Sequence, residues 1–149
     1  MKVGADDEAG MRLALAGAER AAAVGEVPVG AVVIRDGEVI AAAHNETVAS
    51  DDPTAHAEVL ALRRAAGQGR LDDATLYVTV EPCAQCAGAI VLAKVRRVVF
   101  GAWDPKAGMA GSIHDLLRHP QLNHRCEVIG GVLEAECAAP LKAFFDERR

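Results

Sequence analysis

The sequence lacks the long apolar segments that a membrane protein needs. None of its hydrophobic runs approaches the roughly 20 residues that cross a bilayer as a helix, and the acidic first eight residues do not show the basic-then-apolar order of a secretory signal. We therefore expect a cytoplasmic protein with no membrane partner. Its 149 residues suit one domain, residues 1–149, with a sizeable core. Within that domain we expect residues 1–8 to be flexible.

The sequence also lacks the excess of basic residues that is typical of nucleic-acid-binding proteins. It has 16 Lys and Arg against 21 Asp and Glu, a net charge of −5, which argues mildly against a nucleic-acid partner. The acidic excess lies in residues 1–73, which hold seven basic and thirteen acidic residues, whereas residues 74–149 hold nine and eight. Small basic groups in the second half would fit a local phosphate-binding surface, and a solvated surface explains them equally well.

Cysteine is scarce, and its four copies do not indicate a disulfide framework in an intracellular chain. We expect Cys126 and Cys137 to be buried and reduced. Cys83 and Cys86 differ, because two cysteines three residues apart lie on one face of a helix turn. A buried strand is predicted before them and a helix after them. At a helix start the thiolate form is favoured, so this pair is either redox-active or binds a metal.

His56-Ala57-Glu58 occupies a similar position, after a turn and at the start of a helical run. One imidazole and two thiolates make three zinc ligands, His56, Cys83 and Cys86, with a fourth position open for water. Glu58 would be free to move protons beside the metal instead of binding it. The combined pattern H-x-E…P-C-x-x-C is the signature of zinc deaminases.

Three other interpretations compete with this one. A strand followed by C-x-x-C at a helix start is also the thioredoxin arrangement, but a thiol redox module leaves His56 and Glu58 without a role. A closed structural zinc site would need Cys126 or Cys137 as a fourth ligand. A histidine at a helix start can also be a simple cap.

The hydrophobic pattern predicts ten elements, in the order α-β-β-α-β-α-β-α-β-α. The helices are expected at residues 8–24, 55–66, 87–93, 113–118 and 133–146, and the strands at 28–34, 38–43, 75–80, 95–101 and 127–129. Asp36-Gly37 indicates a hairpin turn between the first two strands. This order predicts an α/β fold with a five-stranded mixed sheet covered by helices. The helices that follow the second and third strands would bring His56 near Cys83 and Cys86.

From about Met11 to Arg149 the sequence resembles the cytidine deaminase superfamily, and within it the family of bacterial tRNA-specific adenosine deaminases. The stretches that carry the resemblance are Val27-Pro28-Val29-Gly30-Ala31-Val32, His44-Asn45-Glu46, Asp52-Pro53-Thr54-Ala55-His56-Ala57-Glu58, Tyr77-Val78-Thr79-Val80-Glu81-Pro82-Cys83, Val98-Val99-Phe100-Gly101-Ala102, Asp104-Pro105-Lys106, Gly111-Ser112 and Leu122-Asn123-His124-Arg125. The resemblance implies a cytidine-deaminase-like three-layer α/β/α fold. It also implies conversion of the wobble adenosine of an arginine tRNA to inosine.

The resemblance assigns roles to individual residues. It implies one zinc ion per chain, held by His56, Cys83 and Cys86, with Glu58 as the proton shuttle. Asn45 would hydrogen-bond the flipped purine. Asp104 and Lys106 would face the RNA of the anticodon stem-loop, as would Phe144-Phe145. A homodimer is implied as well, with both subunits shaping each RNA groove.

Two points stay open at this level. Deaminases of free cytosine, guanine or a pterin-like base would share every zinc residue, and only the loop 102–112 favours tRNA. Trp103 stands where many relatives carry a polar or basic residue, and it could either stack on a base or pack within the protein.

Overall fold

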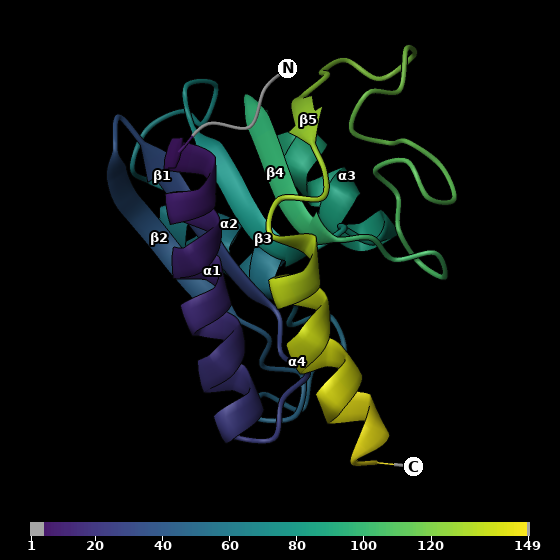
Figure 1. Cartoon of the computed structure of the whole chain (residues 1–149). Coiled ribbons are helices and arrows are strands. Elements are labelled where there is room, and N and C mark those ends of the chain that lie inside the picture. Colours follow the sequence, from purple (N-terminus) through teal and green to yellow (C-terminus); the bar gives the residue numbers. More distant parts are fainter. Residues whose placement is uncertain (1–4, 149) are drawn as a thin grey trace.

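Five strands form one mixed sheet in the computed structural model, which describes residues 5–148 (Figure 1). Along the chain the elements are α1 (Ala5–Ala23), β1 (Gly30–Arg35), β2 (Glu38–His44), α2 (Ala57–Ala65), β3 (Thr75–Val80), α3 (Ala84–Ala93), β4 (Arg97–Ala102), β5 (Glu127–Ile129) and α4 (Glu134–Asp146). The strands lie in the order β2-β1-β3-β4-β5. β1 is antiparallel to β2 and β3, whereas β3, β4 and β5 are parallel.

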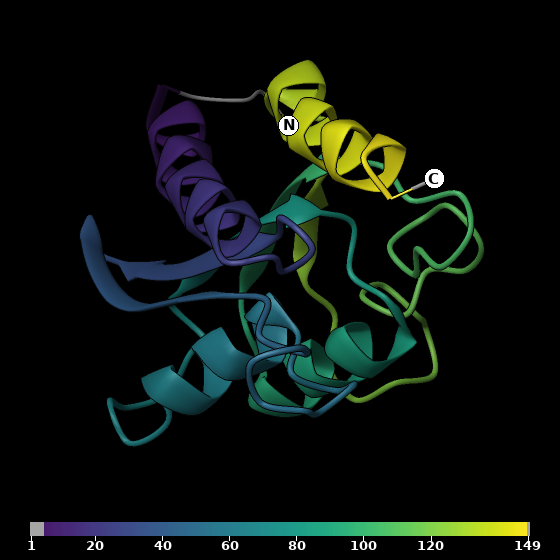
Figure 2. The same cartoon turned by 90° about the horizontal axis from the view of Figure 1, so that it is seen from below.

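The helices cover both faces of the sheet, as Figure 2 shows most clearly. α1 and α4 lie on one face and α2 and α3 on the other, which confirms the predicted three-layer α/β/α fold (Figure 1). Side chains alternate along each strand, so β3 places Leu76 and Val78 in one core cluster and Tyr77 in the other. A sheet buried on both faces explains why the strand sequences read as continuous apolar runs.

The predicted hairpin turn is confirmed. Asp36 and Gly37 connect β1 to β2, and both have positive φ, 50° and 79°. Two such residues in a row form the tight turn whose twist matches that of the flanking strands. This turn returns the chain so that His44, at the end of β2, pairs with Gly30, at the start of β1.

The helix predicted at residues 113–118 does not form. Its backbone groups bond instead to the preceding loop, because the N–H of Ile113 donates to Gly108 O and the N–H of Leu116 donates to Met109 O. Asp115 accepts the N–H of Arg118 at 3.2 Å and pairs with its guanidinium at 2.6 Å. The segment therefore folds back on the loop after β4 as a series of turns.

The N-terminal segment also differs from expectation. Of residues 1–8, predicted to be flexible, the first four lie outside the described residues, but α1 already begins at Ala5. Asp7 is buried, accepts the Tyr77 hydroxyl at 2.9 Å and pairs with both terminal nitrogens of Arg97 at 2.6 Å. These long-range bonds fix the first turn of α1 to β3 and β4. Within residues 5–148, the helices are all too short or too polar to span a bilayer.

Candidate active site and metal centre

The carboxyl ends of two strands and the start of a third meet at a single edge of the sheet. β3 and β4 are parallel, so their carboxyl ends share this edge, and β1, which is antiparallel to β3, begins there. α2 starts directly after His56, and α3 starts directly after Cys83. The two helix N-termini, with their favourable dipole ends, therefore face the same space.

His56, Cys83 and Cys86 come together there, and their ligand atoms lie within 4.8 Å of one another. Nδ1 of His56 is 3.5 Å from the Sγ atom of each cysteine. Zn–S bonds of about 2.3 Å and Zn–N bonds of about 2.1 Å at a tetrahedral angle would separate nitrogen and sulfur by about 3.6 Å. The three side chains therefore fit a metal ion, and the donor set of one imidazole and two thiols suits zinc.

Electrostatics prepares one thiol for ligation. Hydrogen bonds from Cys86 and His56 lower the pKa of Cys83 to about 4, so its thiolate is stable at neutral pH. The hydrogen bond with Cys83 in turn raises the pKa of His56, and the bond to Cys83 together with burial raises the pKa of Cys86. A metal ligand must be deprotonated, and Cys83 meets that condition before any ion binds.

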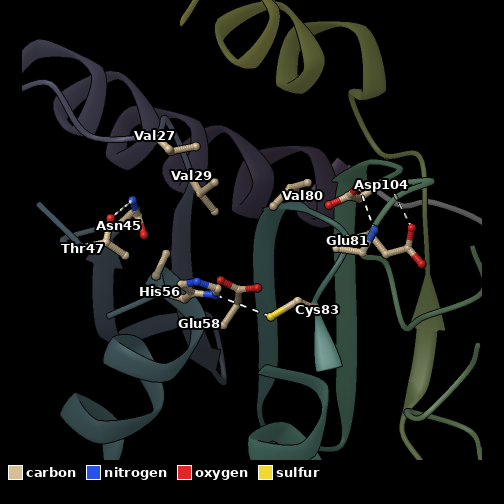
Figure 3. Close-up of a pocket in the computed structure, with 12 residues that line it drawn as sticks. Val27, Val29, Asn45, Thr47, His56, Glu58, Val80, Glu81, Cys83 and Asp104 are labelled. Carbon is tan, nitrogen blue, oxygen red and sulfur yellow. Dashed lines mark hydrogen bonds between the residues drawn. The ribbon is translucent and has the colours of Figure 1, made fainter. Parts of the chain in front are cut away.

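Glu58 lies beside this group without belonging to it. Its side chain is only 3% exposed, and its carboxylate is near His56 and Cys83 in Figure 3. Burial raises the pKa of Glu58 to about 7, with a further contribution from the charge of Cys83. A carboxyl group that titrates near neutrality can both accept and donate a proton. We call His56, Glu58, Cys83 and Cys86 the floor of the site.

The floor opens into a cavity of about 270 Å³. This volume is close to the lower end of the roughly 300–1,000 Å³ of ligand pockets, which suits a small group such as one base. The cavity is lined by Val27, Val29, Asn45, Thr47, His56, Ala57, Glu58, Val80, Glu81, Cys83, Asp104 and Ala107. Figure 3 places Asn45 and Thr47 on one side of the floor, and Glu81 and Asp104 on the other.

The predicted substrate residues occupy different places. Asn45 is buried and lines the cavity, and its amide nitrogen lies 3.4 Å from Oγ1 of Thr47. Asp104 also lines the cavity, but its Oδ1 accepts the N–H groups of Lys106 and Ala107 at 3.0 and 3.2 Å, so it stabilises a turn as well. Lys106 is exposed on that turn and does not line the cavity.

Two buried glutamates order the loops that form the sides of the cavity, and our sequence analysis missed both. We call residues 45–53 and 104–112 the rim loops. Glu26 accepts the N–H groups of Val48 and Ala49 at 3.0 and 2.7 Å in the first loop. Glu81 accepts several N–H groups of the second, and these bonds outweigh burial and lower its pKa. The only sequence feature that could have indicated these two roles is an acidic residue next to an apolar strand.

The alternative interpretations of the motifs fare poorly. His56 makes no side-chain hydrogen bond that caps α2, so it is not a simple cap. Cys126 and Cys137 are buried free thiols, as predicted, and neither joins the cluster among the residues that the structure describes. A closed structural site with four protein ligands is therefore not formed. A thiol redox pair would not require the flanking imidazole or the buried Glu58.

The aromatic residues singled out by sequence lie outside the cavity lining. Trp103 is 45% exposed and packs edge-on against Phe100, with 4.7 Å between ring centres. Phe144 and Phe145 form a similar pair near the end of α4, and the guanidinium of Arg148 lies 3.3 Å from the centre of the Phe144 ring. Trp103 therefore has a packing role, whereas its contact with a base stays a prediction.

The chain is similar to deaminases over nearly its whole length. It is 50% identical over 146 residues to the tRNA-specific adenosine deaminase of Bacillus subtilis, covering 96% of this chain and 91% of the relative. The relative of the same name in Haemophilus influenzae is 47% identical, with 96% and 85% covered.

Solved structures point the same way. One from a study of A-to-I editing by tRNA:A34 deaminases at the wobble position superposes with a TM-score of 0.84 at 45% identity, covering 89% of this chain and 99% of the other. A guanine deaminase from Nitrosomonas europaea gives a TM-score of 0.78 at 27% identity, covering 96% and 86%. The MafB19-like deaminase family matches residues 5–149. The chain therefore belongs to this deaminase family, alongside the tRNA-specific adenosine deaminases.

Proposed function

We propose that this chain, as a single deaminase domain over residues 1–149, converts adenosine to inosine at the wobble position of a tRNA. The observation that carries the proposal is the floor, where a three-residue metal cluster lies beside the buried carboxyl group of Glu58. A metal-bound water and a neighbouring carboxyl group are what a hydrolytic deamination requires, in which water replaces an amino group on a base. The names of the two relatives described above supply the substrate.

His56, Cys83 and Cys86 would hold one zinc ion per chain. The 3.5 Å distances from His56 to both sulfurs support this assignment, as does the low pKa of Cys83. When bound in such an open site, zinc acts as a Lewis acid that lowers the pKa of a coordinated water toward neutrality. The absence of a fourth protein ligand among the described residues leaves room for that water.

Glu58 would carry the protons of the reaction. It would take one proton from the attacking water and deliver it to the purine ring nitrogen, and would then move the proton of the added hydroxyl group to the amino group that departs as ammonia. The carboxyl group is shielded from bulk solvent, which keeps the transferred proton within the cavity. Its position beside the cluster, and not among the three metal-binding side chains, leaves the carboxyl group free of the metal for this task.

The cavity sides would hold the nucleotide. We assign Asn45 to the base, because a buried amide can pair with ring nitrogens and exocyclic groups. A carboxylate such as Asp104 suits a 2′-hydroxyl, and Lys106 suits a phosphate. Phe144-Phe145 would face the RNA strand beyond the cavity. The cytoplasmic location stays a prediction from sequence.

We also propose that the protein is a homodimer. α3 contains no charged residue between Ala84 and Ala93, and its Leu92 is 84% exposed. Gly88 on the same helix has open space above it. An apolar, smooth helix face of this kind is typical of subunit contacts, and the mass in solution, measured by light scattering, tests it.

The function is tested by incubating the metal-loaded protein with an anticodon stem-loop that carries adenosine at the wobble position. Free adenosine, cytidine and guanine serve as competitors, and inosine formation is the readout. A deaminase of free bases is the second candidate, because the guanine deaminase shares this fold. Efficient turnover of a free base with no inosine in the stem-loop would replace our proposal with that one.

A further inference from the structure

Glu81 is a buried carboxylate without a cationic partner among the residues that the structure describes. It follows β3 directly, and its side chain is only 2% exposed. A buried charge is costly unless it is hydrogen-bonded. The bonds come from one segment, because Oε1 accepts the N–H of Asp104 at 3.0 Å, and Oε2 accepts those of Ala110 and Ser112 at 3.0 and 2.9 Å. The hydroxyl of Ser112 donates to Oε1 as well.

The second rim loop is thus wrapped around this one carboxylate. The bonds reach both ends of the loop, residues 104 and 112, and position 110 between them. Gly108 lies against the same group, since a Cβ atom there would be 2.2 Å from Oε1 of Glu81 and 2.6 Å from the carbonyl oxygen of Asp104. A loop without regular secondary structure owes its shape to these contacts.

The same contacts determine one side of the cavity. Asp104 and Ala107 line it, and both belong to the turn that Asp104 stabilises through its Oδ1. The N–H of Asp104 is held by Glu81, as the dashed line between them in Figure 3 indicates. Glu81 itself stands two residues before Cys83. One short segment therefore connects the floor to this side of the cavity.

We propose that Glu81 is a positioning residue, which holds the second rim loop in the shape that binds the nucleotides around the target base. The inference rests on the proposed RNA substrate. Glu81 would affect substrate binding through Asp104 and the turn at Lys106, and not through the floor. Loss of the carboxylate should therefore weaken substrate binding and leave the metal and the chemical step in place.

The test compares Glu81→Gln with the wild type and with Glu38→Gln, a matched change at an exposed position of β2. The amide replaces one acceptor oxygen by a donor that faces N–H groups. Because hydrogen bonds to a charged group are stronger than those to a neutral one, their loss should raise KM for the stem-loop about tenfold or more. We expect kcat and zinc content to stay near wild type. Glu38→Gln should leave KM, kcat and zinc content unchanged.

A second readout does not depend on activity. Lys106 is exposed on the loop and is followed by Ala107, so trypsin can cleave there. If Glu81 holds the loop, cleavage after Lys106 should be faster in Glu81→Gln than in wild type or Glu38→Gln. Ser112→Ala removes only the hydroxyl donor, and it should shift KM and cleavage in the same direction by a smaller factor.

The outcomes separate the two proposals. If the wild type forms no inosine, the RNA function fails, while the cleavage rates still test the loop. If the wild type is active and Glu81→Gln keeps its KM and its resistance to trypsin, the positioning role is overturned. It is also overturned if Glu81→Gln loses zinc, or if kcat falls while KM is unchanged, because Glu81 would then support the floor.

Discussion

The floor and the rim loops of the cavity are built in different ways. Each floor residue is positioned by a helix start within a few residues of its own place in the sequence, His56 and Glu58 at α2 and Cys83 and Cys86 at α3. The rim loops depend on partners far away in sequence. Glu26 bonds to N–H groups 22 and 23 residues further on, and Glu81 to groups 23 to 31 residues further on.

This difference separates the chemistry from the choice of substrate. Local motifs fix the cluster of His56, Cys83 and Cys86 and its neighbouring carboxyl group, to which we assign the chemistry. The long-range bonds fix the shape of the cavity sides, to which we assign the binding of the substrate. Variants of the floor should therefore abolish turnover, whereas variants of the rim loops should change stability and binding.

The largest effect is expected from a metal ligand. Cys83→Ala removes one of the three proposed ligands, so zinc should be lost and inosine formation should fall below detection, since the remaining pair cannot complete the open site. Elemental analysis of protein purified without chelators and the stem-loop assay measure the two losses. Cys126→Ala, a buried cysteine outside the floor, is the matched control. Retention of one zinc per chain in Cys83→Ala would disprove the ligand assignment.

The next largest effect is expected at Glu58. Glu58→Gln keeps the shape of the side chain but cannot carry a proton, so kcat should fall by about 10² to 10⁴ while zinc stays bound. Steady-state kinetics and metal analysis on the same preparation check both halves of this statement. A rate near wild type would remove Glu58 from the mechanism. Loss of zinc would instead make it a ligand.

The sequence predicted the floor well because its signals are local. Two half-motifs, each at a predicted helix start, were enough to bring His56 to Cys83 and Cys86, and the structure places all three within 4.8 Å. The strands were predicted for the same reason. The segments 75–80 and 127–129 match β3 and β5 residue for residue, because short segments rich in apolar and β-branched residues can be identified without reference to distant partners.

The failures are the parts that distant partners decide. Residues 113–118 have helical spacing, but their backbone groups bond to Gly108 and Met109 and not to one another. Residues 5–8 look like a polar terminus, but Asp7 pairs with Arg97, 90 residues away. The roles of Glu26 and Glu81 could not be predicted from the sequence for the same reason. A buried acceptor of backbone N–H groups has no spacing rule in the sequence.

A smaller effect is expected when the first rim loop loses its acceptor. Glu26 is 1% exposed and bonds to the N–H groups of Val48 and Ala49. Glu26→Gln leaves at least one of these buried donors poorly paired, which should lower the free energy of unfolding by about 1–3 kcal/mol. Urea unfolding followed by circular dichroism measures this, with Glu38→Gln as the exposed control. Equal stability of both variants would show that the first loop does not need Glu26.

The smallest effect is expected at Lys106, on the outer surface of the second rim loop. Only its backbone N–H takes part in the turn, through Asp104, so truncating the side chain leaves the loop intact. If the ammonium contacts one phosphate, Lys106→Ala should make the slope of log affinity against log salt less steep by about 0.7 to 0.9. Over a fourfold change in salt this amounts to about a threefold difference in relative affinity.

Binding of the stem-loop at several salt concentrations measures that slope. Arg70→Ala removes an equal charge at the opposite edge of the sheet, before β3, and should leave the slope unchanged. This pair of variants separates a local contact from the net charge of the molecule, because both change the net charge by the same amount. If Lys106→Ala and Arg70→Ala shift the slope equally, the loop carries no phosphate contact. The rim loops would then select substrate by shape alone.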